Sequence, residues 1–176
     1  MENIRKRKLL QILLPVFIIL VIAGIWVYKN YEKDAEPLSP VDEGDFALVA
    51  DSLDIEVLTA YGLPIIIDFG ADYCAPCRQM APVLESVHAQ MQGKAIIKYV
   101  DVVEYSQLTR GYPVQAIPTQ VFINPDGSPY LPSDDMEIEF DIYGDKESGE
   151  HLHTIHLGGL SEEQLLSILA DMGVEE

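Results

Sequence analysis

The chain has 176 residues, of which 48% are hydrophobic, and carries a formal net charge of −18 at pH 7. This length accommodates one modest domain with attached segments, because domains usually contain about 100–200 residues. The strong negative charge argues against anionic partners, so we expect the domain to bind neither nucleic acid nor anionic lipid headgroups.

The N-terminus differs in composition from the rest of the chain. Residues 1–8 are a basic segment that contains RKRK, and residues 9–28 are an uncharged run, LLQILLPVFIILVIAGIWVY. As a helix, this run would be about 30 Å long, which matches the hydrocarbon thickness of a bilayer. Trp26 and Tyr28 end the run, and aromatic rings favour the membrane interface. We therefore predict a transmembrane anchor at residues 9–28.

Other interpretations of the apolar run fit less well. A cleaved signal peptide has a shorter apolar core of about 7–15 residues, followed by small residues at the cleavage site. A lipoprotein needs a cysteine after the run, and a buried soluble helix is not apolar on all faces over this length. Because basic residues are concentrated before the run, the N-terminus is predicted to be cytoplasmic and the domain to lie outside the cytoplasm. This arrangement describes a single-pass protein of the cell membrane.

Residues 29–45, KNYEKDAEPLSPVDEGD, separate the predicted anchor from the domain. This segment is polar, contains two prolines and lacks apolar periodicity, so we interpret it as a linker. The predicted domain then occupies residues 46–176. It begins with a short apolar run at 46–50, FALVA, which predicts an edge strand.

The first half of the domain alternates helical and strand patterns. Residues 51–62 predict a helix that Asp51 or Ser52 caps and that Gly62 ends. The next predicted elements are a buried strand at 65–69, a helix at 75–93, a buried strand at 94–102, a short helix and turn at 105–114, and a strand at 119–123.

The second half contains a predicted hairpin and a final helix. In residues 136–143 the apolar side chains alternate with polar ones, so Met136, Ile138, Phe140 and Ile142 would share one face. A turn follows, and residues 151–157 return as a second strand. Residues 161–173 predict a helix with a capping box. The order of elements favours an α/β domain with a central mixed β-sheet, helices on both faces and a late inserted β-hairpin.

Cys74 and Cys77, in DFGADYCAPCRQMAP, are the only cysteines. A structural zinc site needs four ligands, and no histidine pair completes one at zinc spacing, so we expect no metal. A purely structural disulfide would gain little stability from so short a loop. A redox-active pair is the better interpretation, because the N-terminus of a helix stabilises the Cys74 thiolate, which is the reactive form. Cys77 lies one turn later, near enough to resolve a mixed disulfide, and Pro76 stiffens the turn between them.

The segment IIIDFGADYCAPCRQMAP resembles the strand, active-site loop and kinked helix of the thioredoxin family. AIPT, residues 116–119, resembles the family loop that carries a cis-proline, here Pro118. The resemblance runs from about residue 46 to residue 172 and is interrupted by an insertion at about 130–150. It implies a thioredoxin-like fold and a redox-active Cys74–Cys77 disulfide that works without a cofactor.

The resemblance also implies roles for individual residues. Cys74 would be the nucleophile and Cys77 the resolving thiol. Asp68 matches the buried carboxylate of the family, which helps to move the Cys77 proton, and burial would raise its pKa. Lys98 matches the lysine that can face this carboxylate from the adjacent strand.

The surface around the cysteines is where the chain departs from the family. Pro118 in cis would place the backbone of Ile117 beside the sulfurs, where it could pair with a bound peptide strand. The family usually has tryptophan where this chain has Gly70 and Tyr73, and thioredoxins proper have glycine in place of Ala75. We therefore expect Tyr73, Ala75 and Ile117 to shape substrate binding.

Together these features predict a membrane-anchored thiol–disulfide oxidoreductase that reduces protein disulfides outside the cytoplasm. Cytosolic thioredoxin could not reach such a domain, so its electrons would come from a membrane-embedded thiol carrier. One alternative is an oxidase or isomerase that forms disulfides in secreted proteins. Another is a redox-inert binding module whose hairpin docks a partner, although the intact Cys-Ala-Pro-Cys sequence argues against it.

Overall fold

The computed structural model describes residues 43–175, so the predicted basic N-terminus, anchor and most of the linker lie outside the described residues. Within residues 43–175, no helix has the length and apolarity of a membrane span. The elements are α2 (Glu43–Phe46), α3 (Ile55–Thr59), β1 (Ile65–Gly70), α4 (Ala75–Gln90), β2 (Ile96–Asp101), the 3-10 helix η1 (Ser106–Thr109), β3 (Thr119–Ile123), β4 (Asp141–Gly144), β5 (His151–Leu157) and α5 (Glu162–Asp171).

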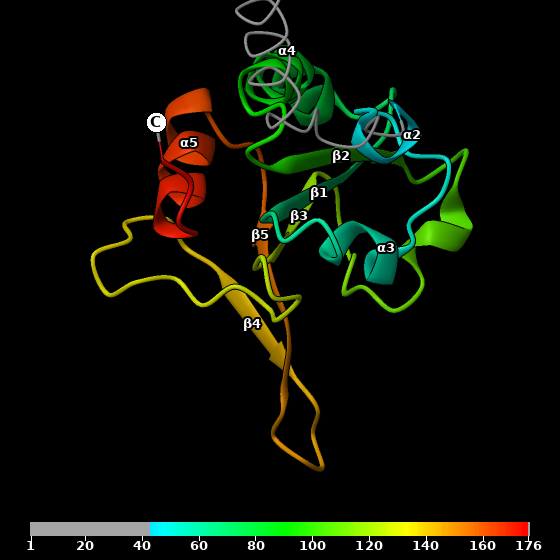
Figure 1. Cartoon of the computed structure of the whole chain (residues 1–176). Helices are drawn as coiled ribbons and strands as arrows, with labels where there is room; N and C mark the ends of the chain where they lie inside the picture. The colour runs from blue at the N-terminus through cyan, green and yellow to red at the C-terminus, as the bar shows by residue number, and fades with distance from the viewer. Residues whose placement is uncertain (1–42, 176) are drawn as a thin grey trace, which may run out of the picture. The chain divides into compact units, whose positions relative to one another are not determined.

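Five strands of the described region form one mixed sheet in the order β2-β1-β3-β5-β4 (Figure 1). The central strand β1 runs parallel to β2 and antiparallel to β3. Strand β5 is antiparallel to both of its neighbours, β3 and β4. The predicted α/β architecture with a central mixed sheet is confirmed.

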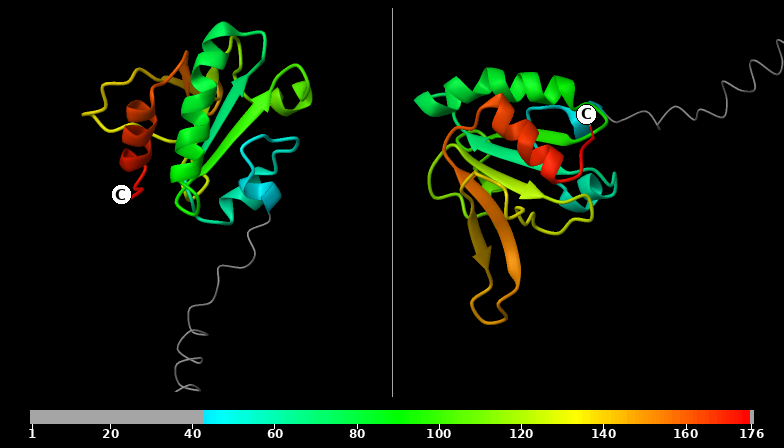
Figure 2. Two further views of the ribbon diagram at one scale, coloured as in Figure 1. Left: turned by 90° about the horizontal axis from the view of Figure 1, so that it is seen from above. Right: turned by 90° about the vertical axis from the view of Figure 1, so that its left-hand side faces the viewer.

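Each face of the sheet has its own apolar core. Helices α4 and α5 lie along one face (Figure 2). There, Leu84 of α4 and Leu165 of α5 pack with Ile66. On the other face, Leu58 of α3 packs with Ile65 and with other strand residues. Because side chains alternate along a strand, a β1 that is covered on both sides must be apolar almost throughout. All six of its residues are buried, as its continuous β-branched run predicts.

The N-terminal part of the domain differs from the prediction. The predicted strand at 46–50 is wrong, because Phe46 ends α2 and Val49 makes only an isolated bridge to β2. The carbonyls of Gly44 and Ala47 instead accept hydrogen bonds from the Lys98 ammonium, at 3.0 and 2.8 Å. Only Leu48 and Ala50 of this segment form backbone hydrogen bonds with β2, both with Tyr99.

Helix α3 is also shorter than predicted. It begins after Asp54, whose carboxylate accepts the N–H of Val57 at 3.2 Å, and not after Asp51 or Ser52. Gly62, predicted to end the helix, lies two residues beyond the C-cap Ala60 and adopts a positive φ of 65°.

The inserted segment folds only partly as the alternating pattern predicts. Met136, Ile138 and Phe140 pack against the core beneath α4 and α5, but they do not belong to a strand. The alternation then breaks, because Ile142 is exposed while Tyr143 packs against the opposite core. Strands β4 and β5 extend past the body of the domain as a two-stranded arm (Figure 1).

Candidate active site

The two cysteines lie where the chain passes from β1 into α4. Cys74 is the N-cap of this helix, and its Sγ accepts the N–H of Cys77 at 3.3 Å. Cys74 and Cys77 form a disulfide, and Pro76 occupies the first turn between them. The N–H groups and positive dipole end of the helix will favour the Cys74 thiolate once this disulfide is reduced.

The cis-proline loop lies against the disulfide. The Ile117–Pro118 peptide bond is cis, as predicted. The carbonyl oxygen of Ile117 lies 3.6 Å from the Sγ of Cys74, so its backbone is beside the sulfurs. The Gly158 N–H at the end of β5 donates to the carbonyl of Pro118 at 2.9 Å. The sheet therefore holds this loop in place.

Asp68 projects from β1 toward α4 and is only 1% exposed. Its Oδ1 accepts a hydrogen bond of 2.6 Å from the Nε2 of Gln120 on β3. A Cβ added at Gly70 would lie 3.5 Å from Asp68 Oδ2 and 3.4 Å from Cys77 Cβ, so this oxygen faces the space beside Cys77. Burial raises the pKa of Asp68 to about 7, while the Gln120 hydrogen bond lowers it. This direction is the one that its burial predicts, and a carboxyl with a pKa near neutrality can accept or donate a proton there.

Lys98 does not face Asp68, so that prediction is wrong. In the parallel pairing of β1 with β2, Lys98 is opposite Ile67, whereas Asp68 is opposite Tyr99. Paired residues project to the same face, so Lys98 and Asp68 lie on opposite faces of the sheet. The Lys98 ammonium holds the N-terminal segment and takes no part in the site.

Comparison with known proteins shows to which family the chain belongs. A family model described as thioredoxin matches residues 47–135, about half of the chain. The chain belongs to the thioredoxin family. It is 34% identical over 73 residues to thioredoxin 1 of Nostoc sp., an alignment that covers 42% of this chain and 68% of that one. It is 39% identical over 56 residues to the mitochondrial thioredoxin of Bos taurus, covering 32% of this chain and 34% of the relative.

The matched relatives are aligned only in part. The chain spans about a third of the length of the mitochondrial thioredoxins it matches. Among solved structures, the chloroplastic thioredoxin z is similar at 25% sequence identity and a TM-score of 0.49, over 73% of this chain and 95% of that one.

The ring of Tyr99 lies directly beside Gly70. A Cβ at Gly70 would lie 2.8 Å from Cε2 of the Tyr99 ring, closer than non-bonded carbon atoms approach. Burial raises the pKa of Tyr99 to about 12, and Asp101 and Asp72 add to the rise, so the phenol is neutral near pH 7. The absence of a side chain at Gly70 therefore makes room for the Tyr99 ring. A cavity of 210 Å³ is lined by this ring and by Cys77.

Exposed apolar side chains flank the cysteines. Tyr73 is 72% exposed and directly precedes Cys74. Val103 follows β2, Leu157 pairs with Thr119 beside the cis-proline, and both are exposed. The sequence predicts a contact role for Tyr73 but gives no signal for Val103 or Leu157, because only the strand pairing brings the ends of β2 and β5 to the end of β1.

The other predicted contact residues are also accessible. Ala75 is exposed in the first turn of α4, next to the exposed Pro76, and Ile117 is half-buried. The structure therefore presents the sulfurs between α4 and the cis-proline loop. Cys74 is 8% exposed there and Cys77 5%.

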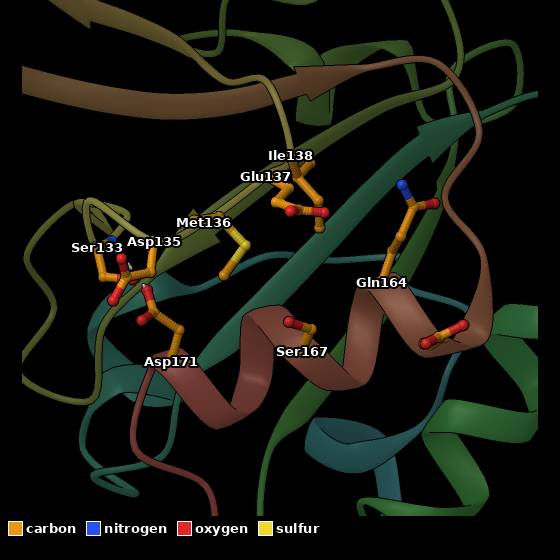
Figure 3. A pocket seen from close by; sticks show the side chains of 9 residues that line it. Ser133, Asp135, Met136, Glu137, Ile138, Gln164, Ser167 and Asp171 are labelled. Carbon is orange, nitrogen blue, oxygen red and sulfur yellow. Dashed lines mark hydrogen bonds between the residues drawn. The ribbon is translucent and has the colours of Figure 1, made fainter.

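A separate, acidic cavity of 650 Å³ lies between the insertion and α5 (Figure 3). Asp135, Glu137 and Glu163 line it, together with Asp171, which accepts the N–H of Ser133 at 3.1 Å. Within residues 43–175, no cluster of three or more His, Cys, Asp or Glu side chains is arranged to hold a metal ion. This cavity contains no cysteine, and the Asp171 contact serves to hold the insertion on α5.

We expect Asp68→Asn to stabilise the oxidised protein at pH 8 and to change its stability little at pH 4. The folded-state pKa of about 7 exceeds the ordinary value of 3.8, so the folded state binds this proton more tightly than the unfolded chain. The resulting stability is complete below about pH 4 and is lost as the pH rises through about 7. The loss amounts to about 4 kcal/mol at most.

Urea denaturation at both pH values measures this difference. Asp72→Asn is the matched control, because Asp72 is exposed. An equal gain for Asp68→Asn at pH 4 and pH 8 would contradict the assignment.

Proposed function

We propose that this protein is a thiol–disulfide oxidoreductase that acts on protein disulfides through Cys74 and Cys77. The proposal rests on how three groups are arranged around the disulfide. A cysteine pair at the N-terminus of α4 lies against the cis-proline loop, and a buried carboxyl with a near-neutral pKa lies beside Cys77. Membership of the thioredoxin family supports the same chemistry.

In the reducing direction, the Cys74 thiolate attacks one sulfur of a substrate disulfide. The substrate disulfide breaks, its other sulfur leaves as a thiolate, and Cys74 holds the first sulfur in a mixed disulfide. Ionised Asp68 accepts the Cys77 proton, and the Cys77 thiolate then attacks Cys74 Sγ. The substrate sulfur that was bound to Cys74 leaves and gains a proton, and the Cys74–Cys77 disulfide forms. Two electrons have passed from the protein to the substrate.

The surface around the sulfurs supports protein substrates. An extended peptide beside Ile117 would lie next to the backbone of the cis-proline loop, where main-chain hydrogen bonds position it. The exposed side chains of Tyr73, Val103 and Leu157 offer apolar contacts at the same end of the sheet.

Insulin reduction with dithiothreitol as the electron source tests the activity. We expect the wild-type protein to accelerate the reduction, and Cys74→Ser to abolish the acceleration because the nucleophile is lost. Cys77→Ser should also stop turnover, yet it should retain substrate as a mixed disulfide on Cys74 that a reductant releases. A wild-type protein with both thiols reduced and no activity would disprove the proposal.

We further propose that residues 9–28 anchor the domain outside the cytoplasm. The support is the length of the uncharged run and the basic residues that precede it, which lie outside the described residues. A membrane-impermeant maleimide should therefore label the cysteines in intact cells after mild reduction. Labelling only after lysis would contradict this orientation, and a chain lacking residues 9–28 is the control for membrane association.

We also propose that the site works as a reductant, supplied with electrons by a membrane-embedded thiol carrier. A domain outside the cytoplasm is out of reach of cytosolic reductants, which is the reason for the carrier. Equilibration with glutathione buffers and alkylation of the free thiols should give a potential near that of thioredoxin, about −270 mV. A potential above about −150 mV would instead indicate a disulfide-forming oxidase, because such a pair is more stable when reduced.

A further inference from the structure

Gln120 is a buried amide on β3, next to the apolar residues Val121, Phe122 and Ile123. It lies on β3 directly opposite Asp68 and is fully buried. Its Nε2 donates to Asp68 Oδ1 at 2.6 Å and also lies 3.5 Å from the sulfur of Met80. Its Oε1 has no hydrogen-bond partner, and no other buried side-chain N or O within residues 43–175 shares this condition. An apolar residue would avoid the cost of that unsatisfied oxygen, so packing alone does not account for a glutamine.

We propose that Gln120 is a positioning residue for proton transfer between Asp68 and Cys77. The role rests on the proposed oxidoreductase function and deepens it. The amide occupies one carboxyl oxygen, Oδ1, and leaves Oδ2 toward the space beside Cys77. Without this bond the carboxyl could rotate, and neither oxygen would be held toward the thiol.

The amide of Gln120 suits both protonation states of Asp68. When the carboxyl is ionised, the N–H···O⁻ bond is charge-assisted and therefore stronger. When Oδ2 carries the proton taken from Cys77, Oδ1 remains an acceptor and the same bond persists. Gln120 thus favours the basic form of Asp68 without introducing a charge that would keep it permanently ionised.

Among the groups around Asp68, Gln120 is the main one that favours the ionised carboxyl. The titratable groups that face it are Cys77 from α4 and Tyr99 from β2, while β3 contributes the uncharged Gln120. Lys98, the nearest cation in sequence to Tyr99, is on the other face of the sheet.

The test isolates the step in which Cys77 acts. Reduced full-length protein is mixed with Ellman's reagent, which forms a mixed disulfide on Cys74, and the nitrothiobenzoate released by Cys77 is followed by stopped flow from pH 5 to 9. In the wild type we expect the rate to rise with pH as Asp68 ionises. In Gln120→Leu the carboxylate loses its donor, so the rising limb should move about one pH unit higher.

At pH 7 the Gln120→Leu rate should therefore fall several-fold and recover at pH 9. Met80→Leu is the matched control, because it removes the second contact of Gln120 Nε2 but keeps the bond to Asp68. The rate of Met80→Leu should rise over the same pH range as that of the wild type. A ¹³C NMR titration of the Asp68 carboxyl should show the same upward shift in Gln120→Leu, and Gln120→Met provides a longer apolar replacement should the leucine variant fail to fold.

The outcomes separate the two proposals. In Gln120→Leu, the rising part of the rate–pH profile could stay at the wild-type pH while the rate falls equally at all pH values. That result would show a packing role. It would overturn the role of Gln120 and leave the proposed function intact. A wild-type protein that forms the mixed disulfide and never resolves it would contradict the proposed function, and the role of Gln120 with it.

Discussion

A carboxyl group buried in the central strand of the sheet is the constraint on which this site depends. Asp68 is surrounded by isoleucine and phenylalanine along β1, and its charge is poorly solvated there. The strand tolerates it because Gln120 supplies a hydrogen bond and because the pKa has moved to about 7. The same burial that costs stability at high pH makes the group a usable acid and base for a neighbouring thiol.

The rest of the site is arranged around that carboxyl. Helix α4 covers it and places Cys77 over β1, while Cys74 lies at the helix end, where a thiolate is favoured. Gly70 leaves the space between Asp68 and Cys77 open, and the ring of Tyr99 closes it from β2. Asp68 and Cys77 are therefore shielded from bulk solvent, while Tyr73 and Ala75, the chain neighbours of Cys74, are exposed.

The fold could be predicted largely from the sequence where local and tertiary preferences agree. The β-branched run of β1, the capping box of α5 and the buried Leu165 face were all found from their patterns. The segment at 46–50 and the insertion could not be predicted in this way. An apolar run predicts burial. It does not predict whether its backbone carbonyls accept hydrogen bonds from a neighbouring strand or from the Lys98 ammonium.

The sequence by itself determined the chemistry of this protein: two cysteines three residues apart, an aspartate in an apolar strand and a proline far downstream, because these depend on residue type and spacing along one chain. The tertiary structure alone decided which side chains meet. A one-residue difference in the pairing of two strands reverses the face to which a side chain points. That register placed Tyr99 and Gln120 beside Asp68 and turned Lys98 away, and no property of an isolated strand contains it.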